Sequence, residues 1–485
     1  MNIAFAASEC APLAKTGGLA DVVGALPREL VELGHEVTVY LPFYARIRKQ
    51  MAGEPKYVAR SITIPFRYYN RFVGVVDGGM RDGVRYYFID CPELFDRAEL
   101  YGSGGVDYTD NAERFGLFCR AMIEAAKLLG VPDVFHVHDW QAALIPVYLR
   151  TTYASDPALH STATVLTIHN AAYQGAFPPK TTEDLLFPWD VFTMDKLEQF
   201  DHFNFLKGGI VFSDQLTTVS RKYAREIQTA EFGEQLEGVL HGRAADLHGI
   251  LNGVDYAQWN PAADRYLAAH FTPENLDGKR ICRADLLHAF GLENVAETTP
   301  VIGIVSRLAT QKGFGILAQI AEELAEHNLA VVALGTGEPF YENLFRGWAF
   351  RHPASVGVQI RYDEALAHKI EAGADMFLMP SLYEPCGLNQ IYSLKYGTVP
   401  IVRATGGLDD TIEEWDATKG TGTGFKFAGY EPADLLAEID RALEAFEDKE
   451  GWIRLMRNGM AQNYGWSASA KEYELVYEEA AKRRS

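Results

Sequence analysis

A short glycine turn between two apolar segments constrains the fold of this chain most strongly. Ile3–Ala7 has the composition of a strand, Lys15–Leu19 (KTGGL) follows it, and Asp21–Leu33 has helical periodicity. Gly17 and Gly18 would let a ligand approach the backbone, and the free amides of a first helical turn favour an anion. With the charge of Lys15 beside them, the turn predicts a phosphate site, although it also fits a tight turn with a surface lysine. Its spacing is neither GxxxxGK[ST] nor GxGxxG.

The second half of the chain contains a comparable basic turn. Val301–Val305 is a β-branched apolar run, and Arg307 and Lys312 follow it in a predicted strand-to-helix turn. Ligands of open parallel sheets bind beyond the carboxyl ends of the strands, where both basic turns are expected. A single Arg or Lys is usually only solvated, but two such turns favour two domains that face each other across a deep cleft.

Strand-like runs alternate with helix-length periodic segments in both halves, which predicts an α/β fold with two Rossmann-like domains. The turn-rich segment 248–261 is the expected crossing point, with a boundary near residue 250. Ser61–Ile64 and Phe72–Val76 are predicted to form an antiparallel hairpin on the first sheet. The other expected strands are Ile3–Ala7, Val37–Leu41, Tyr86–Ile89, Val134–Val137, Val165–Ile168, Leu216–Val219, Val301–Val305, Leu329–Leu334, Val356–Ile360, Met376–Met379, Val399–Val402 and Phe425–Phe427.

Composition excludes several classes of partner. The 485 residues include 65 acidic and 45 basic side chains, and the net charge of −20 argues against nucleic acid or an anionic membrane as a partner. No apolar stretch approaches the roughly 20 residues that span a bilayer, so a soluble cytoplasmic protein is expected. The five cysteines are scattered without CxxC spacing, which predicts reduced thiols.

Polar residues after predicted strands are the candidates for chemistry. Glu384, in the loop after Met376–Met379, is placed to hold sugar hydroxyls, or it caps the next helix. A further glycine turn, Thr405-Gly406-Gly407, offers more amides for a phosphate.

Histidines follow two strands of the first half. His136 and His138 share one face of a strand, a spacing that fits a metal, while Asp139 and Trp140 favour a sugar site. His169 and Asn170 end another strand at the same edge, where the histidine is also compatible with a purely structural role.

In order and spacing these motifs resemble the bacterial glycogen synthases and plant starch synthases, which are retaining glycosyltransferases of the GT-B fold that use ADP-glucose. The resemblance covers nearly the whole chain. Asn389 departs from the family pattern, which has Thr before Gln390. The segments that carry the resemblance are Lys15–Val22, His138–Trp140, Thr167–Asn170, Gly249–Gly253, Glu384–Leu388 and Thr405–Leu408.

The resemblance implies an N-terminal acceptor domain (1–249), a C-terminal donor domain (250–460) and a final helix (461–485) that returns to the first domain. It implies transfer of glucose from ADP-glucose to the non-reducing end of glycogen or another α-1,4-glucan, with no cofactor and no metal. The expected catalytic residues are His169, Glu384, Arg307, Lys312 and Asp139. The expected ADP-glucose residues are Lys15, Gly17, Gly18, Arg307, Lys312, Glu384, Cys386, Gly387, Leu388, Thr405, Gly406 and Gly407, and the acceptor residues are Tyr101, Asp139, His138 and Asn170.

Three other functions share parts of this pattern. A nucleotide-sugar epimerase has the same two-domain fold and phosphate cations but needs no long glucan site. A non-catalytic glucan-binding protein would have no use for two phosphate sites. A pyridoxal-dependent phosphorylase is disfavoured because the chain is short for that family and lacks its motifs.

Overall fold

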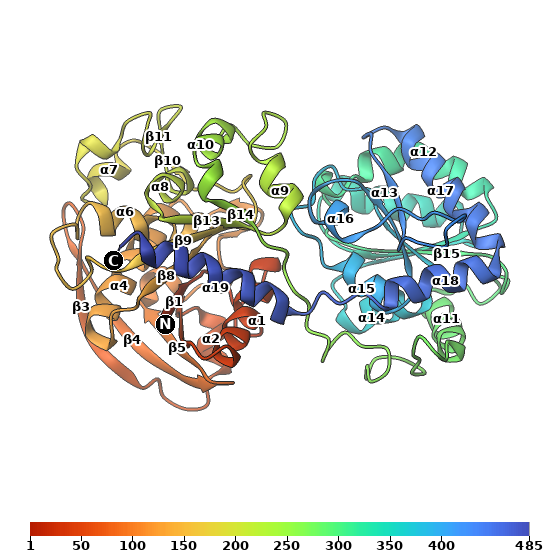
Figure 1. Cartoon of the computed structure of the whole chain (residues 1–485), viewed down its shortest axis with the longest axis horizontal. Helices are drawn as coiled ribbons and strands as arrows, with labels where there is room; N and C mark the ends of the chain where they lie inside the picture. Colours follow the sequence, from red (N-terminus) through yellow and green to blue (C-terminus); the bar gives the residue numbers. More distant parts are fainter. Residues whose placement is uncertain (485) are drawn as a thin grey trace. The chain divides into compact units, whose positions relative to one another are not determined.

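The computed structural model describes residues 1–484, and its contacts divide the chain into two compact units (Figure 1). Unit 1 comprises Met1–Val219, Ala224–Gly253 and the final helix from Trp466; unit 2 comprises Ser220–Tyr223 and Val254–Gly465. Val254 pairs with Gly465 within unit 2, while Gly253 lies against Trp466 within unit 1. The main passages of the chain between the units, at 253/254 and 465/466, are therefore neighbours.

Unit 1 is built on a nine-stranded sheet in the order β14-β13-β9-β8-β1-β2-β5-β4-β3. Its first seven strands in that order are parallel, and the β3–β4 hairpin adds the antiparallel edge that the sequence predicts. The strands are β1 (Asn2–Ala6), β2 (Glu36–Pro42), β3 (Tyr57–Pro65), β4 (Asn70–Arg81), β5 (Val84–Asp90), β8 (Val134–His138), β9 (Ala163–Ile168), β13 (Gln215–Thr218) and β14 (Leu247–Gly249), with short pairs β6 (Gly102–Ser103) and β7 (Val106–Asp107), and β10 (Ala176–Phe177), β11 (Glu198–Gln199) and β12 (His202–Asn204) outside this sheet.

Strand β14 lies in the segment from which a turn-rich crossing is expected. It is only three residues long and contains His248 and Gly249, so it lacks the β-branched run that signals a strand. Its pairing of Leu247 with Leu216 of β13 determines its structure. The turn-rich prediction for residues 248 and 249 was therefore wrong, because tertiary pairing overrides their weak local preference.

The helices of unit 1 cover its sheet. α1 packs against β2, and α19, the last helix, packs against α1 and against strands β8, β9 and β13 (Figure 1). The helices are α1 (Gly18–Glu32), α2 (Ala45–Gln50), α3 (Pro92–Phe95), α4 (Asn111–Leu129), α5 (Asp139–Ala142), α6 (Leu144–Arg150), α7 (Thr181–Asp184), α8 (Phe205–Phe212), α10 (Glu237–Gly242) and α19 (Trp466–Lys482), with 3-10 turns η1 (Trp189–Val191) and η2 (Ala244–Asp246). Helix α9 (Arg221–Glu226) begins in unit 2 and ends in unit 1.

Unit 2 has a six-stranded, wholly parallel sheet in the order β17-β16-β15-β18-β19-β20. Every one of these strands is predicted from the sequence, and the four inner ones are largely apolar, as expected for strands buried on both faces. They are β15 (Val301–Val305), β16 (Ala330–Gly335), β17 (Val356–Ile360), β18 (Met376–Met379), β19 (Val399–Arg403) and β20 (Phe425–Phe427).

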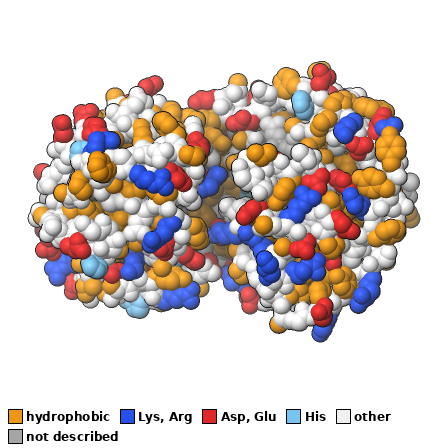
Figure 2. Space-filling view, turned by 180° about the vertical axis from the view of Figure 1, so that it is seen from behind, with side chains coloured by type: hydrophobic (Ala, Val, Ile, Leu, Met, Phe, Trp, Pro, Cys, Tyr) orange, Lys and Arg blue, Asp and Glu red, His pale blue; other side chains and the backbone are white. Residues whose placement is uncertain are grey.

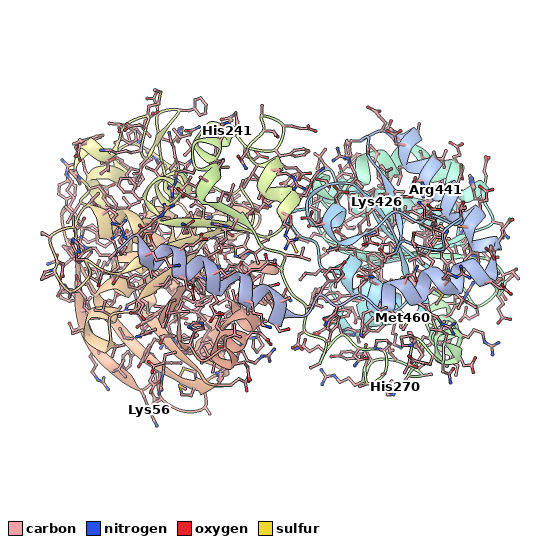
Figure 3. The ribbon with its side chains drawn as sticks, in the orientation of Figure 1. Lys56, His241, His270, Lys426, Arg441 and Met460 are labelled. Atoms are coloured by element: carbon pink, nitrogen blue, oxygen red, sulfur yellow. The ribbon has the colours of Figure 1, made fainter. Side chains whose placement is uncertain are left out.

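Two apolar clusters lie on opposite faces of the second sheet. Ile302 and Ile304 point into the cluster formed with α12, α13, α17 and α18, whereas Val301 points into the cluster formed with α11 and α14. Met460, labelled in Figure 3, ends α18 in a third cluster with Phe271 and Tyr396. The helices are α11 (Asp277–Phe290), η3 (Thr310–Lys312), α12 (Phe314–Glu326), α13 (Pro339–Arg351), α14 (Glu364–Gly373), α15 (Asn389–Lys395), α16 (Gly406–Thr411), α17 (Pro432–Glu447) and α18 (Lys449–Met460).

The final helix is joined to unit 1 by polar contacts as well as apolar ones. Tyr477 Oη lies 2.9 Å from His136 Nδ1 in the buried interior, and Ser469 Oγ donates to the carbonyl of Leu251 at 2.6 Å. The return of the last helix to the first domain, which the resemblance implies, is confirmed.

Charged side chains of both signs are interspersed on the face of each unit that Figure 2 draws. Among residues 1–484, no helix is both long and apolar enough to span a membrane.

Candidate active site

The carboxylate of Glu9 accepts hydrogen bonds within the loop before α1. Thr16 N donates to Glu9 Oε2 at 2.6 Å, Gly17 N donates to the same oxygen at 3.0 Å, and the Thr16 hydroxyl donates to Glu9 Oε1 at 2.6 Å. Glu9 is buried, and Lys15 Nζ is instead 2.6 Å from Asp21 Oδ1. The loop amides do favour an anion, as expected, but the Glu9 carboxylate occupies two of them.

Gly17 and Gly18 are not required by the fold. Gly17 has an extended backbone with φ −151°, and a Cβ added at either position would meet no atom within 4 Å. α1 begins at Gly18, three residues earlier than expected. The first N–H groups of any helix have no acceptor within it, and here Ala20 N donates to Gly17 O at 3.2 Å. The open space at the two glycines leaves room for a ligand to contact the backbone directly.

Tyr101 joins the same cluster from a distant segment. Its hydroxyl donates to Glu9 Oε1 at 2.6 Å and lies 2.7 Å from Ser8 Oγ. Burial raises the pKa of Tyr101 well above its ordinary value, so the phenol stays protonated. Sequence analysis missed Glu9, although its position directly after the first strand, at a carboxyl end, is a usable signal.

The histidines of β8 lie against the end of β9 and the histidine that follows it. His138 Nδ1 is 3.0 Å from His169 Nε2, and His136 Nε2 is 2.6 Å from the Thr167 hydroxyl. Burial lowers the pKa of His169 to about 3 and holds those of His136 and His138 well below the usual range, so all three rings are neutral. His138 Nε2 is buried without a hydrogen-bond partner among the described residues.

Asp139 occupies a strained turn at the same edge. Its φ of +52° is unusual for a residue other than glycine, and its Oδ1 accepts the N–H of His169 at 2.7 Å. Such backbone strain is found preferentially at functional sites. Asn170 Oδ1 accepts the N–H of Ala172 at 3.0 Å, so the Asn170 side chain stabilises the following turn.

The second group of residues belongs to unit 2 and follows β15 and β18. Lys312 Nζ lies 2.5 Å from Glu384 Oε2, with side chains 18% and 8% exposed, and the Ser381 hydroxyl donates to the same oxygen at 3.3 Å. Arg307 is exposed, and its Nη2 is 3.4 Å from Gln311 Oε1. The structure thus pairs Glu384 with a cation, whereas sequence analysis gave the two residues separate roles.

Glycines fix the loop that carries Glu384. A Cβ at Gly406, where φ is +46°, would lie 1.9 Å from Glu384 O, and one at Gly407 would lie 2.0 Å from Cys386 O. The N–H of Gly407 donates to the carbonyls of Glu384 and Pro385, at 3.1 and 3.2 Å. This amide, expected to be open to a phosphate, is therefore already engaged, and the turn that contains Thr405 positions the Glu384 loop.

Further contacts join this loop to the basic turn. Leu382 N donates to Gln311 O at 2.9 Å, and a Cβ at Gly313 (φ +77°) would lie 1.8 Å from Pro380 O. Asn389 donates from Nδ2 to Val305 O at 2.7 Å, so the residue that departs from the family pattern still makes a hydrogen bond. Cys386 is buried, Gly387 has φ +69°, and Leu388 immediately precedes α15.

Comparison with known proteins places the chain. Residues 2–242 match the starch synthase catalytic domain family, and residues 291–458 match the glycosyl transferases group 1 family. The glycogen synthase of Koribacter versatilis is 57% identical over 485 residues, covering 100% of this chain and 99% of the relative. The chain belongs to the glycogen synthase family.

Other glycogen synthases and solved structures agree with this assignment. The glycogen synthase of Anaeromyxobacter dehalogenans (strain 2CP-C) is 48% identical, covering 98% of this chain and 99% of that protein. The catalytic domain of starch synthase IV from Arabidopsis thaliana, bound to ADP and acarbose, has a TM-score of 0.89 and 32% identity, with 99% of each chain covered. Sucrose-phosphate synthase from Thermosynechococcus elongatus, at 16% identity and a TM-score of 0.58 over 99% and 98% of the chains, shares the fold.

Family membership confirms the GT-B class with two Rossmann-like domains, and it identifies a glycosyltransferase. It therefore sets aside the epimerase, the non-catalytic glucan-binding protein and the phosphorylase. Within the described part of the chain, no three His, Cys, Asp or Glu side chains are grouped to hold a metal ion.

Asp139 should make stability depend on pH. Burial, with a further contribution from Glu9, raises its pKa to about 7 from an ordinary 3.8. The folded protein then keeps a proton that the unfolded chain loses, so the free energy of unfolding falls as pH rises from about 4 to about 7. In Asp139→Asn we expect this fall to be smaller, by up to about 3 kcal/mol between roughly pH 5 and pH 8.

Urea unfolding midpoints across this pH range measure the difference. The exposed residue Asp107 provides the control, because Asp107→Asn should keep the wild-type profile. Parallel profiles for Asp139→Asn and the wild type would mean that the Asp139 carboxyl is ionised at neutral pH.

Proposed function

We propose that the chain transfers glucose from ADP-glucose to the non-reducing end of an α-1,4-glucan such as glycogen, with retention of the anomeric configuration. The observation that carries this proposal is the full-length identity of 57% to a named glycogen synthase, together with the likeness to a starch synthase bound to ADP and acarbose. The proposed location is the cytoplasm, with which five buried cysteines that form no disulfide agree.

The leaving group sets the electrostatic demand of this reaction. As the bond between the anomeric carbon and the phosphate oxygen breaks, its electron pair goes to the diphosphate, and positive charge develops on the sugar ring. We assign Arg307 and Lys312 to the developing negative charge, together with Lys15 and the first-turn amides of α1 near Gly18. A preorganised donor of this kind is commonly worth roughly 3 kcal/mol of barrier, because it need not reorient during the reaction.

The departing phosphate also serves as the base in this proposal. The acceptor hydroxyl attacks the anomeric carbon from the same face and passes its proton to the phosphate oxygen, so a second carboxylate acting as a nucleophile is not required. A retaining glycosidase would need two carboxyls about 5 Å apart. The charges on Arg307, Lys312 and Lys15 supply what a metal would otherwise supply, and we propose that no metal or cofactor takes part.

Glu384 is assigned to the hydroxyls of the donor sugar. Its Oε2 is held by Lys312 at 2.5 Å and by Ser381 at 3.3 Å, so the carboxylate has a fixed orientation and its other oxygen can accept a sugar hydroxyl. Cys386, Gly387 and Leu388 continue this donor loop, and Thr405, Gly406 and Gly407 brace it.

Residues of unit 1 are assigned to the sugar ring and the acceptor. His169, neutral and fixed by His138, would support the electron-poor ring through its side chain or its carbonyl. Asp139 would orient the acceptor, with His138, Asn170 and Tyr101 on the same side. The hydroxyl of Tyr101 is committed to Glu9, so its contribution would come from the ring or through Glu9.

Radiolabelled donor tests the reaction directly. Incubation of the protein with glycogen and ADP-[14C]glucose should place label in the polymer, from which an α-1,4-specific exo-hydrolase acting at non-reducing ends should release it. The kcat/KM for UDP-glucose should be lower than that for ADP-glucose, and EDTA should leave the rate with ADP-glucose unchanged. Label transferred only from UDP-glucose would overturn the nucleotide assignment, and no labelled polymer from either donor would overturn the function.

The donor-holding role of Glu384 predicts a catalytic defect. Glu384→Ala should lower kcat by roughly 10²-fold or more while leaving the KM for glycogen unchanged, because it removes a contact to the donor sugar and frees Lys312. Steady-state kinetics with each substrate varied measure this, with melting curves to verify folding. Glu447→Ala, an exposed position in the same unit, is the control. Near-full turnover in folded Glu384→Ala would contradict the role.

A substitution at Gly18, in the turn where α1 begins, should weaken the binding of ADP-glucose without affecting folding. A Cβ at Gly18 would meet no atom within 4 Å, so the free energy of unfolding of Gly18→Ala should lie within about 1 kcal/mol of the wild-type value. If a phosphate approaches this backbone, the same methyl group should raise the KM for ADP-glucose by roughly tenfold, equivalent to about 1.4 kcal/mol. Gly238→Ala, at another glycine of unit 1 with open space, is the matched control. Unchanged kinetics in Gly18→Ala would remove this loop from the donor site.

A further inference from the structure

Four residues from the first half of the chain belong to unit 2. The chain leaves unit 1 after Val219, contributes Ser220–Tyr223 to unit 2, and returns to unit 1 at Ala224. Helix α9 begins at Arg221, within this short segment. Four residues cannot form a core of their own, so specific contacts must hold Ser220–Tyr223 in unit 2.

The contact made by Ser220 ends on the loop that carries Glu384. Ser220 is fully buried, and its hydroxyl donates to the carbonyl oxygen of Pro385 at 2.5 Å. The same hydroxyl oxygen accepts the N–H of Tyr223 at 3.2 Å, so Ser220 also caps the start of α9. A cap uses only the lone pairs of a hydroxyl oxygen, and its proton stays free for another acceptor. Capping alone therefore does not explain the bond to Pro385.

Lys222 adds two contacts with α16. Its N–H donates to Asp410 Oδ2 at 2.7 Å, and its Nζ lies 3.2 Å from Asp409 Oδ2. Helix α16 begins at the glycine turn that braces the Glu384 loop. The segment Ser220–Tyr223 therefore contacts both the loop and the turn that supports it.

Every backbone carbonyl from Leu382 to Gly387 accepts a hydrogen bond, so the loop is held along its whole length. Ser220 lies outside the continuous stretch Val254–Gly465 of unit 2, whereas the other donors named below lie within it. The donors are Arg403 Nη1 to Leu382, Gln311 Nε2 to Tyr383, Gly407 N to Glu384 and Pro385, Ser220 Oγ to Pro385, and Gln390 Nε2 to Cys386 and Gly387.

We propose that Ser220 is a positioning residue for glucose transfer: its hydroxyl holds the Pro385 carbonyl and thereby fixes the place of the Glu384 carboxylate. This inference rests on the function proposed above. Pro385 directly follows Glu384, so a shift of the Pro385 peptide group moves the Glu384 side chain relative to Lys312, its partner at 2.5 Å. A displacement of about 1 Å in a group that contacts the reacting substrate can cost roughly 10²-fold in rate.

The substitution Ser220→Ala tests this role in the full-length enzyme. We expect kcat with ADP-glucose to fall roughly tenfold, because the loop loses one of its bonds, while the KM for glycogen stays within about twofold of the wild-type value. In a Glu384→Ala background the same substitution should change kcat by less than about twofold, since no carboxylate remains to be positioned. A fall of equal size in both backgrounds would mean that Ser220 acts on the fold in general, and it would overturn the inference.

Hydrogen–deuterium exchange gives a second measurement, which does not depend on activity. Peptides that cover residues 381–388 should exchange at least roughly threefold faster in Ser220→Ala than in the wild type, and peptides that cover 449–460 should not change. Asp448→Ala is the matched control, because the exposed Asp448 caps α18 of the same unit by accepting Gly451 N at 3.1 Å. In Asp448→Ala only the peptides over 449–460 should exchange faster, and kcat should equal that of the wild type.

Unchanged exchange over residues 381–388 in folded Ser220→Ala would overturn the inference whether or not the protein transfers glucose. A wild type that labels no polymer would overturn the proposed function instead, and faster exchange in Ser220→Ala would then still show that Ser220 holds the loop. If Ser220→Ala does not fold, crystals of the wild type with ADP decide the question. A Ser220 hydroxyl bonded to the Pro385 carbonyl supports the inference, and a hydroxyl without that bond overturns it.

Discussion

The parallel register of the two sheets is the constraint on which the rest of the structure depends. Parallel strands bring all their carboxyl ends to one edge, so residues far apart in the chain meet there without any local signal. In unit 1 this edge joins the segments after β8 and β9, and His138 thereby comes within 3.0 Å of His169. In unit 2 it joins the turn after β15 to the loop after β18, which pairs Lys312 with Glu384. The chemistry of each unit follows from strand order.

The same constraint explains which features the sequence predicts. Helices bury both faces of the unit 2 sheet, so its four inner strands (β16, β15, β18 and β19) are largely apolar, and runs of β-branched and aromatic residues identify the strands of this sheet from the sequence. β14 escapes prediction, since it is short and is defined by its pairing with β13. Among candidate site residues, position after a strand identifies Glu384, Lys312, His138 and His169, but not their partners. The contacts of Glu9 with Tyr101, and those of Asp214 with Arg150 and Arg483, were missed because they join segments far apart in the chain.

Glycine has opposite roles in the two similar turns. Gly406 and Gly407 are required by close packing, since a Cβ would overlap the carbonyls of Glu384 and Cys386. Gly17 and Gly18 have open space around them, and the fold would accept alanine at either position. Sequence similarity between the turns therefore does not imply a shared function. In unit 2 the glycines serve the orientation of Glu384, whereas in unit 1 they leave backbone exposed beside a loop whose amides already hold the Glu9 carboxylate.

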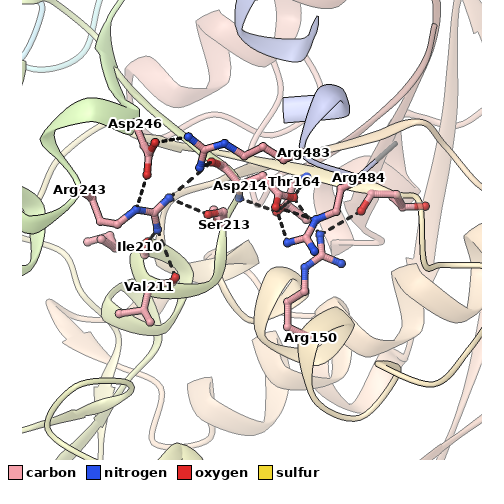
Figure 4. A network of polar contacts seen from close by, with 11 residues as sticks. Arg150, Thr164, Ile210, Val211, Ser213, Asp214, Arg243, Asp246, Arg483 and Arg484 are labelled. Atoms are coloured by element: carbon pink, nitrogen blue, oxygen red, sulfur yellow. Dashed lines mark hydrogen bonds and ion pairs between the residues drawn. The ribbon is translucent and has the colours of Figure 1, made fainter. Parts of the chain in front are cut away.

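The last helix links the two edges of unit 1. α19 begins at Trp466, directly after the chain leaves unit 2, and it contacts the buried His136 through Tyr477 before ending beside Arg483 and Arg484. His136 packs against His138 with ring centroids 4.2 Å apart, and His138 holds His169. One continuous series of contacts thus runs from Asp214, which Arg483 and Arg484 contact (Figure 4), through α19 to the histidines. Such contacts transmit a change only through an element that has two stable positions, because contact alone carries no coupling.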